Sequence, residues 1–290
     1  MRSVALKVDR RVPTRLAGDV GLDHDVSKRA LERLPTPRRS AVSASFPAPV
    51  RPPYSALADV YDEIMQDVPY DAWCGFVRRE LAQRGWTGHR VLDLGCGTGR
   101  AGEPYRDHGF EVVGVDPSEA MIRAARGRDP GGRYLVGDAR TLALDERFDL
   151  VVAVFDALNN LTGDGELGLA CERVAAHLGP GGAFAFDVNT AVGLESLWED
   201  GVAEGWAGDV YYRWEHTWDP VNRRARVAAY CRGPRGAFVE HHEERPYEPY
   251  ELEAALRGAG FHTVDVITFP DGARADASEP RVWVIARLPG

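Results

Sequence analysis

The sequence is poor in cysteine and lacks the patterns in which cysteine has a structural use. Its 290 residues include four cysteines, and no two of them form a C-x-x-C pair. A disulfide framework or a zinc site requires such clustering. We therefore expect neither a bound metal nor disulfide bridges, and a reducing, cytoplasmic environment.

Long apolar runs are also missing. No segment approaches the roughly 20 apolar residues that a membrane-spanning helix needs, and the N-terminus has no continuous apolar core of the kind that a signal peptide shows. The formal net charge of −9 argues against a surface that binds nucleic acid. These absences predict a protein without a membrane or nucleic-acid partner.

Residues 1–52 differ in composition from the rest of the chain. They are rich in arginine and proline and are basic, whereas the remainder is acidic. Within them, residues 25–34 alone show the apolar spacing of a helix, which Pro35 ends. Two interpretations stay open, a docking or dimerisation arm and a flexible extension, and we favour the second. We expect one folded domain from residue 53 to residue 290.

A glycine-rich stretch from Arg90 to Arg100, reading R-V-L-D-L-G-C-G-T-G-R, stands out in that domain. The apolar run before Gly95 is typical of a strand buried on both faces. Gly95, Gly97 and Gly99 then let the backbone turn sharply and leave no Cβ atoms between the chain and a ligand. We expect a helix to begin just beyond, with its free amide groups pointing into the same crevice. Strand, turn and helix together predict a nucleotide-binding site.

The kind of nucleotide is indicated by what the stretch lacks. The dinucleotide fingerprint G-x-G-x-x-G would need a glycine at Arg100. The chain reads D-x-G-x-G-x-G instead, with Asp93 on the strand. A carboxylate there suits the ammonium and sulfonium of S-adenosylmethionine better than a pyrophosphate. The pattern resembles the class I S-adenosylmethionine-dependent methyltransferases, which implies this cofactor and places Asp93, Gly95 and Gly97 among its binding residues.

Two further segments resemble the same family in the expected order. Glu111–Asp116 is an apolar strand that ends in an acid about twenty residues past the first glycine, where an acid can accept both ribose hydroxyls. Asp116 could equally be a helix cap, and Pro117 follows it at the start of the next helix. A third strand then leads to Asp138 and Ala139. The resemblance implies that Asp138 meets the adenine amino group and that the adjacent backbone amide meets the ring.

Apolar strands at 148–155 and 183–188, and a final pair at 261–269 and 282–288, complete the pattern of elements. The resemblance implies an α/β fold with a seven-stranded, mostly parallel Rossmann-like sheet, with helices on both faces.

The segment before the glycine turn predicts two amphipathic helices. Its A-D-V-Y-D sequence at 58–62 resembles small-molecule members of the family, among them the N,N-dimethyltransferases that act on nucleotide-linked amino sugars. That resemblance implies that Tyr61 and Tyr70 lie near the methionine end of the cofactor. Both could instead be half-buried aromatic residues that use their hydroxyls at the surface.

The segment after the fourth strand reads F-D-A-L-N-N-L, from Phe155 to Leu161. Methylases that act on exocyclic amines of nucleic-acid bases carry an N-P-P-Y-type motif at this place. This chain lacks it, which argues against a DNA or RNA substrate. We expect Phe155 to contact the cofactor, Asp156 to act where the methyl group is transferred, and Asn159 to bind the substrate. Alternatively, Asp156 and Asn159 cap the helix predicted at 165–178.

Beyond the fifth strand the pattern changes to the alternation of exposed antiparallel strands, at 210–218, 224–231 and 237–245. We expect an antiparallel β insertion at 209–245 that forms either a lid over the substrate or a dimer interface. Trp214 would then contact substrate from the aromatic face of the insertion. Asn189 would contact it from the fifth strand, because ligands gather at the carboxyl ends of parallel strands.

In the third strand of the insertion, acidic residues and histidines that could take part in catalysis are crowded together. Adjacent strand residues point to opposite faces, so His241 and His242 cannot easily share a metal ion. We favour His242 as the histidine that positions substrate or accepts a proton, and Arg245 as a substrate-binding residue. The bland alternative is a solvated charged strand.

These predictions combine into one function. We expect methyl transfer from S-adenosylmethionine to a small-molecule acceptor, at nitrogen, oxygen or carbon, in natural-product biosynthesis. The protein must hold the acceptor in line with the reactive carbon and exclude water. Two alternatives are a non-catalytic partner protein that binds the cofactor and, less favoured, a nicotinamide-dependent oxidoreductase. A homodimer is compatible with the insertion.

Overall fold

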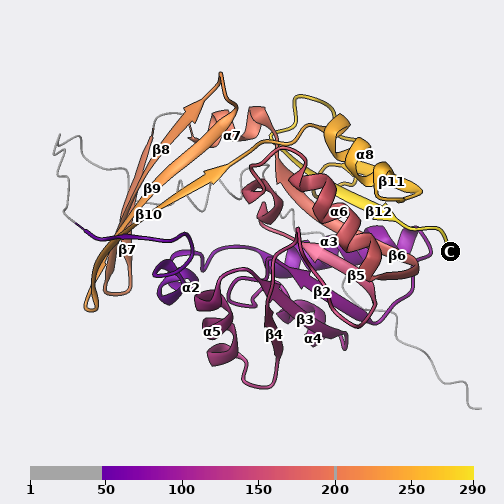
Figure 1. The fold of residues 1–290 in the computed structure, drawn as a ribbon, viewed down its shortest axis with the longest axis horizontal. Helices are drawn as coiled ribbons and strands as arrows, with labels where there is room; N and C mark the ends of the chain where they lie inside the picture. The colour runs from indigo at the N-terminus through magenta and orange to yellow at the C-terminus, as the bar shows by residue number, and fades with distance from the viewer. Residues whose placement is uncertain (1–47, 199–200) are drawn as a thin grey trace, which may run out of the picture.

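The computed structural model describes residues 48–198 and 201–290. The helix predicted at 25–34 and most of the predicted extension lie outside the described residues. Two β-sheets dominate the described chain, and Figure 1 shows the larger one packed among helices and the smaller one standing beside it.

The larger sheet has seven strands in the order β11-β12-β6-β5-β2-β3-β4. The five strands from β4 to β6 pair in parallel, whereas β12 is antiparallel to both of its neighbours. This confirms the predicted seven-stranded, mostly parallel Rossmann-like sheet. The strands are β2 Arg90–Leu94, β3 Glu111–Asp116, β4 Arg133–Val136, β5 Phe148–Ala153, β6 Leu178–Asn189, β11 Thr263–Ile267 and β12 Arg281–Arg287.

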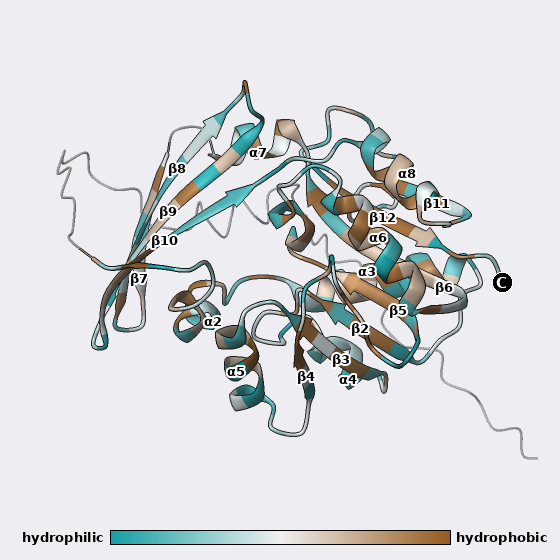
Figure 2. Ribbon diagram, viewed as in Figure 1, coloured by the Kyte–Doolittle hydropathy of each residue, from teal (hydrophilic) through white to brown (hydrophobic). Residues whose placement is uncertain are grey.

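Helices cover both faces of this sheet because its central strands are apolar on both sides. Leu150 and Val152 of β5 pack in a cluster with α3 (Tyr70–Gln83), and Val151 packs in another with α6 (Glu166–His177) and α8 (Pro249–Gly258). Figure 2 shows these central strands in the hydrophobic colour range. A fully buried side chain of this kind contributes about 1.5–3 kcal/mol to folding. The paired cores hold the strand ends, and therefore the loops that follow them, in fixed positions.

A helix begins just beyond the glycine turn, as predicted. It is α4 (Glu103–Asp107), which has five residues and starts three residues later than Arg100. Gly99 has a positive φ of 84°, so the helix cannot include it, and Pro104 lies in the first turn, where proline favours a helix start. That its free amide groups face a ligand stays a prediction. The next helix, α5 (Glu119–Arg128), also begins as expected, with the Ser118 hydroxyl accepting a hydrogen bond from the Met121 amide.

The smaller sheet has the strand order β1-β10-β9-β8-β7, antiparallel except for the pairing of β1 with β10. Three of its strands match the predicted segments. A further strand, β7, lies before residue 209 and was not predicted, because residues such as Gly205 and Ala207 carry a weak strand signal. The strands are β1 Val50–Arg51, β7 Val202–Ala207, β8 Val210–Asp219, β9 Arg224–Gly233 and β10 Gly236–Glu244.

The smaller sheet packs on the N-terminal segment and on α7 (Ala191–Trp198). Leu57 of η1 (Leu57–Asp59) and Val60, which precedes α2 (Tyr61–Ile64), form a core cluster with Tyr212 and Cys231. The inner face of the sheet is thereby directed at the carboxyl ends of β5 and β6. At the outer edge, Trp206 of β7 is 66% exposed. A homodimer through this edge stays a prediction.

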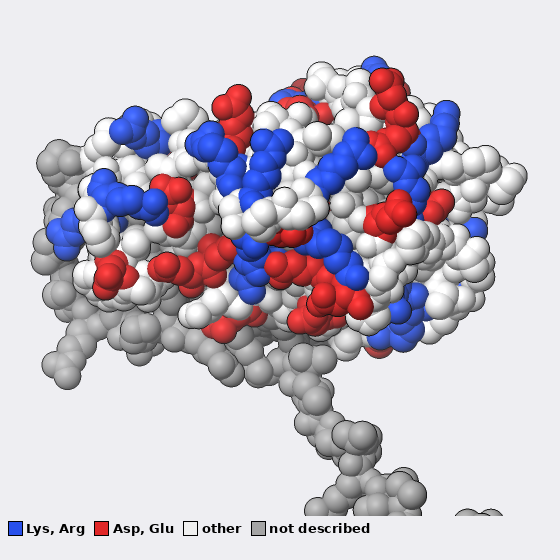
Figure 3. Space-filling model, turned by 90° about the horizontal axis from the view of Figure 1, so that it is seen from below, with Lys and Arg blue, Asp and Glu red and all other residues white. Residues whose placement is uncertain are grey.

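The surface carries charges of both signs side by side, as Figure 3 shows for one face. Many of these groups are paired, as Arg128 is with Asp62 and Glu103. Among the residues described, no helix combines the length and the apolar character needed to cross a membrane.

Candidate functional site

The glycine turn after β2 forms the floor of the site. Gly95, Gly97 and Gly99 all have positive φ values, of 74°, 53° and 84°, which non-glycine residues adopt at a cost. The amides of Gly95 and Cys96 both donate to the Val115 carbonyl, and so the turn is fastened to β3. A Cβ atom on Gly97 would meet nothing within 4 Å. At Gly97 the turn therefore presents bare backbone to open space, as a close-fitting ligand requires, whereas a Cβ on Gly95 or Gly99 would meet Ala157 or Tyr134.

Asp116 lies directly beside this open space, at the end of β3. Its Oδ2 accepts a hydrogen bond from the Gly97 amide at 2.9 Å, and its Oδ1 accepts one from the Ser118 amide at 2.8 Å. The residue is 8% exposed. Burial raises the pKa of this carboxyl, although the two amide donors oppose the change. Each oxygen keeps a lone pair, so the group can hold the turn and also accept two ligand hydroxyls.

Asp93 lies under the turn rather than beside the open space. It is 1% exposed, its Oδ2 has no hydrogen-bond partner, and the backbone amide of Gly102 is its donor. Burial raises the pKa of Asp93 to about 7, against the opposing influence of Arg106. This position gives Asp93 the role of supporting the turn from below. Direct contact between its carboxylate and a ligand stays a prediction.

Asp138 and Ala139 follow β4, but Asp138 is already paired. Its Oδ1 accepts hydrogen bonds from the Arg140 amide and the Arg140 Nε, both at 2.8 Å. The Arg140 hydrogen bonds hold the pKa of Asp138 below its ordinary value, even though burial acts in the opposite direction. Arg140 also pairs with Glu166. A role for Asp138 or Ala139 toward adenine stays a prediction, and Asp138 would have to share its oxygens with Arg140.

A polar cluster lies where β5 and β6 end. Phe155 and Asp156 have positive φ values of 60° and 50°, and their amides donate to the two oxygens of Asp187, at 2.7 and 3.2 Å. Arg281 reaches both Asp187, at 2.6 Å, and Asp156, at 3.1 Å. The side-chain Nδ2 of Asn189 donates to Asp156 Oδ2 at 2.9 Å. The cluster holds Asp156 in a strained turn, directly after Phe155.

Glu244, at the end of β10, approaches this cluster from the smaller sheet. It is 7% exposed, has a hydrogen-bond contact with Asn189, and its Oε2 has no partner. Burial raises the pKa of Glu244 well above its ordinary value, and nearby Asp156 raises it further, whereas Arg281 opposes both. Burial also raises the pKa of Asp187, to about 6. The site thus holds two buried carboxyl groups, the half-buried Asp156 and one arginine.

Three tyrosines complete the wall on the N-terminal side. Burial is the main cause that raises the pKa of Tyr54, Tyr61 and Tyr70, and the charge of Asp156 contributes at each of them. All three are therefore neutral phenols within electrostatic range of Asp156. Tyr70 also packs against the Arg100 guanidinium at 5.2 Å. Contact of Tyr61 with a cofactor, and the position of Tyr70 near it, stay predictions.

Glu240 and His242 tie the smaller sheet to this wall. Glu240 is fully buried, and its carboxylate accepts hydrogen bonds from the amides of the 54–57 turn. Although burial acts against it, His242 and these amides lower the pKa of Glu240. His242 Nε2 lies 3.2 Å from Glu240 Oε2, and its ring packs edge-on against Tyr54, with 4.6 Å between centroids. Its Nδ1 has no hydrogen-bond partner.

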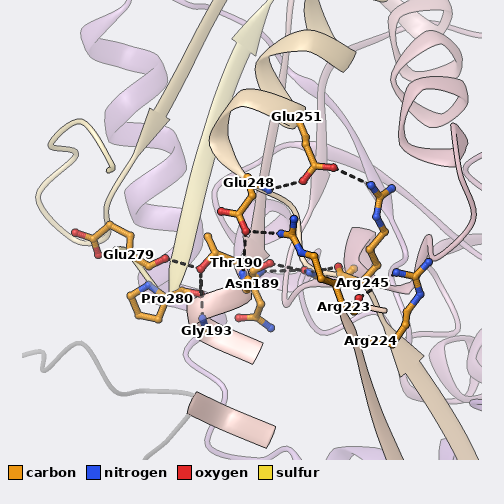
Figure 4. Close-up of polar contacts among 12 residues, drawn as sticks. Asn189, Thr190, Gly193, Arg223, Arg224, Arg245, Glu248, Glu251, Glu279 and Pro280 are labelled. Atoms are coloured by element: carbon orange, nitrogen blue, oxygen red, sulfur yellow. Dashed lines mark hydrogen bonds and ion pairs between the residues drawn. The ribbon is translucent and has the colours of Figure 1, made fainter. Parts of the chain in front are cut away.

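Two predicted substrate residues have structural roles. Asn159, in η2 (Ala157–Asn160), is fully buried, and its side chain binds only backbone groups, those of Asn189 and Arg245. Arg245 itself pairs with Glu251 at 2.7 Å and stacks on Tyr247. Figure 4 shows Arg245 reaching toward Glu251. Neither side chain joins the cluster around Asp156, and their contact with a substrate stays a prediction.

The polar contacts in Figure 4 also fasten the turn between β8 and β9 to the main domain. Arg223 pairs with Glu248 at 2.6 Å, and Arg224 donates to the Thr162 carbonyl at 2.7 Å. With the Glu240 contacts at its other end, the smaller sheet is held over the site at two points.

Sequence reasoning missed Tyr54, Glu244 and Arg281. A signal existed for Arg281, because an antiparallel final strand must begin at the edge where β6 ends, and Arg281 pairs with Asn189 in that register. The alternation of the strand had already placed Glu244 on the same face as His242. Tyr54 carried no comparable signal.

These features define a class before any comparison: an α/β nucleotide-binding protein whose open glycine turn and adjacent Asp116 form a cradle for a ribose-bearing ligand. Residues 91–182 match the family model described as "Methyltransferase domain". YqeM of Bacillus subtilis, which is assigned to the methyltransferases, is 30% identical over 216 residues, or 72% of this chain and 86% of that protein. The chain therefore belongs to the S-adenosylmethionine-dependent methyltransferases.

Two further relatives cover most of the chain. A solved S-adenosylmethionine-dependent methyltransferase from Clostridium acetobutylicum has a TM-score of 0.70 and 25% identity, over 81% of this chain and 98% of that one. The dTDP-3-amino-3,4,6-trideoxy-alpha-D-glucopyranose N,N-dimethyltransferase of Streptomyces venezuelae is 29% identical over 231 residues, or 74% of this chain and 94% of that protein.

S-adenosylmethionine is the cofactor, as the sequence predicted. The residues present fit it. A Cβ on Gly97 would project into the open space that the turn leaves, and Asp116 has acceptor capacity left for the ribose. The excess of carboxyl groups around Asp156 suits a positively charged sulfur.

Proposed function

We propose that the chain methylates a small-molecule acceptor in a natural-product pathway, at a site around Asp156 beneath the smaller sheet. Bound S-adenosylmethionine supplies the electrophilic methyl carbon. The support for this proposal is the convergence of Asp156, Glu244 and the tyrosines on one region that the smaller sheet covers. The N,N-dimethyltransferase relative makes an amino sugar the first acceptor to try.

The residues of this chain act by placement. Gly97 and Asp116 hold the nucleoside, and the turn at Phe155 and Asp156, strained and supported by Asp187, sets the edge of the transfer site. Aligning two reacting atoms at about 3–3.5 Å replaces a large entropic cost of meeting in solution. The smaller sheet and Tyr54 exclude water, which strengthens the electrostatic interactions inside.

The test is transfer of a radiolabelled methyl group to a panel of acceptors. The panel holds dTDP-linked 3-amino sugars, their 3-hydroxy counterparts and phenols. We expect label in at least one small molecule, together with S-adenosylhomocysteine. Binding of the cofactor without transfer to any class would favour the alternative of a non-catalytic partner protein. Label in a supplied protein or nucleic acid, and in no small molecule, would refute the proposal.

A further inference from the structure

The inner face of the smaller sheet carries an unusual concentration of polar atoms that lack partners. Six described residues have a buried side-chain polar atom without a hydrogen-bond partner, and three of them, Trp214, His242 and Glu244, lie on this face. Buried polar groups in folded proteins are nearly always paired, so such groups in one place call for a ligand. His242 and Glu244 are each 7% exposed.

The register of the strands shows how these groups are arranged. Trp214 on β8 and Glu240 on β10 both pair with Ala229 of β9, so they share one row across the sheet. His242 lies one row further along β10, and Glu244 one row beyond that. At the usual strand spacings, the Cα atoms of His242 and Glu244 are about 7 Å apart and those of Trp214 and His242 about 12 Å apart. That span suits a ligand of one or two rings.

The middle of this face carries smaller side chains than its two sides. β9 contributes Ala225, Val227 and Ala229 between the aromatic side chains of β8 and the acids of β10. A ring lying over the small residues would meet an N–H donor at Trp214, a ring nitrogen at His242 and a carboxyl group at Glu244.

Charge decides the chemistry at the Glu244 end. Arg281 pairs with Asp156 and Asp187, and two backbone amides also stabilise Asp187. Glu244 is left without a cation of its own. An unpaired buried carboxylate is costly, so the carboxyl group instead stays protonated or acquires a positive partner. Its raised pKa reflects the same environment, in which burial comes first and Asp156 second.

We propose that Trp214, His242 and Glu244 form the acceptor-binding face, and that the acceptor carries a basic nitrogen whose proton passes to Glu244. The inference rests on the proposed function. A protonated amine has no free electron pair, so it attacks only after one N–H bond breaks and leaves that pair on the nitrogen. The proton then forms an O–H bond with the Glu244 carboxylate, and an ammonium–carboxylate pair becomes an amine and a carboxylic acid. A buried site favours the neutral pair.

A hydroxyl acceptor fits this arrangement less well. It brings no positive charge to offset a Glu244 carboxylate that has no cation of its own. A protonated amine brings that charge to a region in which Arg281 already pairs with Asp156 and Asp187.

The experiment measures binding, not turnover. The full chain, saturated with S-adenosylhomocysteine, is titrated with glucosamine and glucose and with cyclohexylamine and cyclohexanol. We expect each amine to bind at least about tenfold more tightly than its alcohol, a difference of about 1.4 kcal/mol. In Glu244→Gln the amine-to-alcohol ratio should fall to about 1, and Glu244→Asp should recover part of it. Glu243→Gln is the matched control, because Glu243 lies on the opposite face of β10 and pairs with Arg226.

A second variant tests the other end of the face. Trp214→Phe keeps the ring and removes the N–H donor. It should weaken glucosamine, which has hydroxyls to accept that bond, and leave cyclohexylamine unchanged.

The outcomes separate the inference from the proposed function. Retained amine preference in Glu244→Gln, tighter binding of the alcohols, or no binding of any probe to the S-adenosylhomocysteine complex would overturn the inference. Label transfer to a hydroxyl or carbon acceptor at wild-type rate by Glu244→Gln would do so as well, while the proposed function would stand. Absence of transfer to any small molecule would remove the proposed function, and the binding ratios would still report on Glu244.

Discussion

Replacing Asp116 tests the central assignment of the cofactor site. Asp116→Ala removes a carboxylate that accepts the amides of Gly97 and Ser118, at 2.9 and 2.8 Å, and that has one further lone pair on each oxygen. We expect the variant to bind S-adenosylhomocysteine much more weakly, because it loses both the ribose acceptors and the fastening of the glycine turn.

The magnitude follows from the number of bonds. A hydrogen bond to a charged group contributes about 1.5–3 kcal/mol. Loss of two such bonds to the ribose hydroxyls therefore costs about 3 kcal/mol or more, which is at least about a hundredfold in Kd. Looser placement of Gly97 adds to that loss. Isothermal titration calorimetry at neutral pH measures it directly.

The control is Glu119→Ala. It removes the same charge three residues along the chain, from a side chain that is 79% exposed, so it should leave affinity within about twofold, as expected for a screened surface charge. Near-UV circular dichroism checks that both variants are folded. If folded Asp116→Ala bound the ligand as tightly as the control, the assignment of Asp116 to the ribose would be refuted.

Three further predictions concern the glycine turn, Glu240 and Arg281. Gly97→Ala should lose about 1 kcal/mol of folding free energy to backbone strain and at least about tenfold in cofactor affinity. Gly85→Ala, with a similar φ of 65° and equally open space, should lose stability alone. Calorimetry measures the affinity and thermal melts measure the stability, so together they separate the two effects. Glu240→Gln should lower the free energy of unfolding by about 2 kcal/mol while Glu243→Gln does not. Because the folded-state pKa of Glu240 lies below its ordinary 4.5, its stabilisation is present above that value and fades as pH falls through the folded pKa, so urea curves of wild type and variant should converge in acid. Arg281→Met should destabilise by about 3–5 kcal/mol, since buried carboxylates lose their cation; an unchanged urea midpoint would show that the cluster is already neutral.

The sequence carried enough information for the large sheet because its signals are local. The apolar runs of β2, β3, β5 and β6 and the glycines at 95, 97 and 99 each state a backbone preference that no distant residue overrides. The helix predicted just beyond the turn is α4, and Gly99 and Pro104 explain why it begins at Glu103. In β7 the small residues weakened the strand signal, and the strand forms because β8 lies beside it.

The candidate site was only partly predictable. Asp116 lies within the sequence signature that predicted it, whereas the predicted role of Asp156 at the methyl-transfer site stays a prediction. Asn159 and Arg245 were assigned to the substrate because they occupy suggestive segments, yet their side chains satisfy backbone amides and a neighbouring carboxylate. Which atoms a polar side chain binds depends on partners far away in the chain, and a motif does not contain them.

The sequence by itself determined the cofactor class, because the glycine turn and the acid at the end of β3 lie close together along the chain. The tertiary structure alone decided the acceptor side. Its residues come from distant parts of the chain, and folding brings the smaller sheet to the ends of β5 and β6. These residues are Tyr54, Glu244 and Arg281. Burial and the balance of charge are properties of that assembled environment, and they raise the pKa of Glu244 well above its ordinary value.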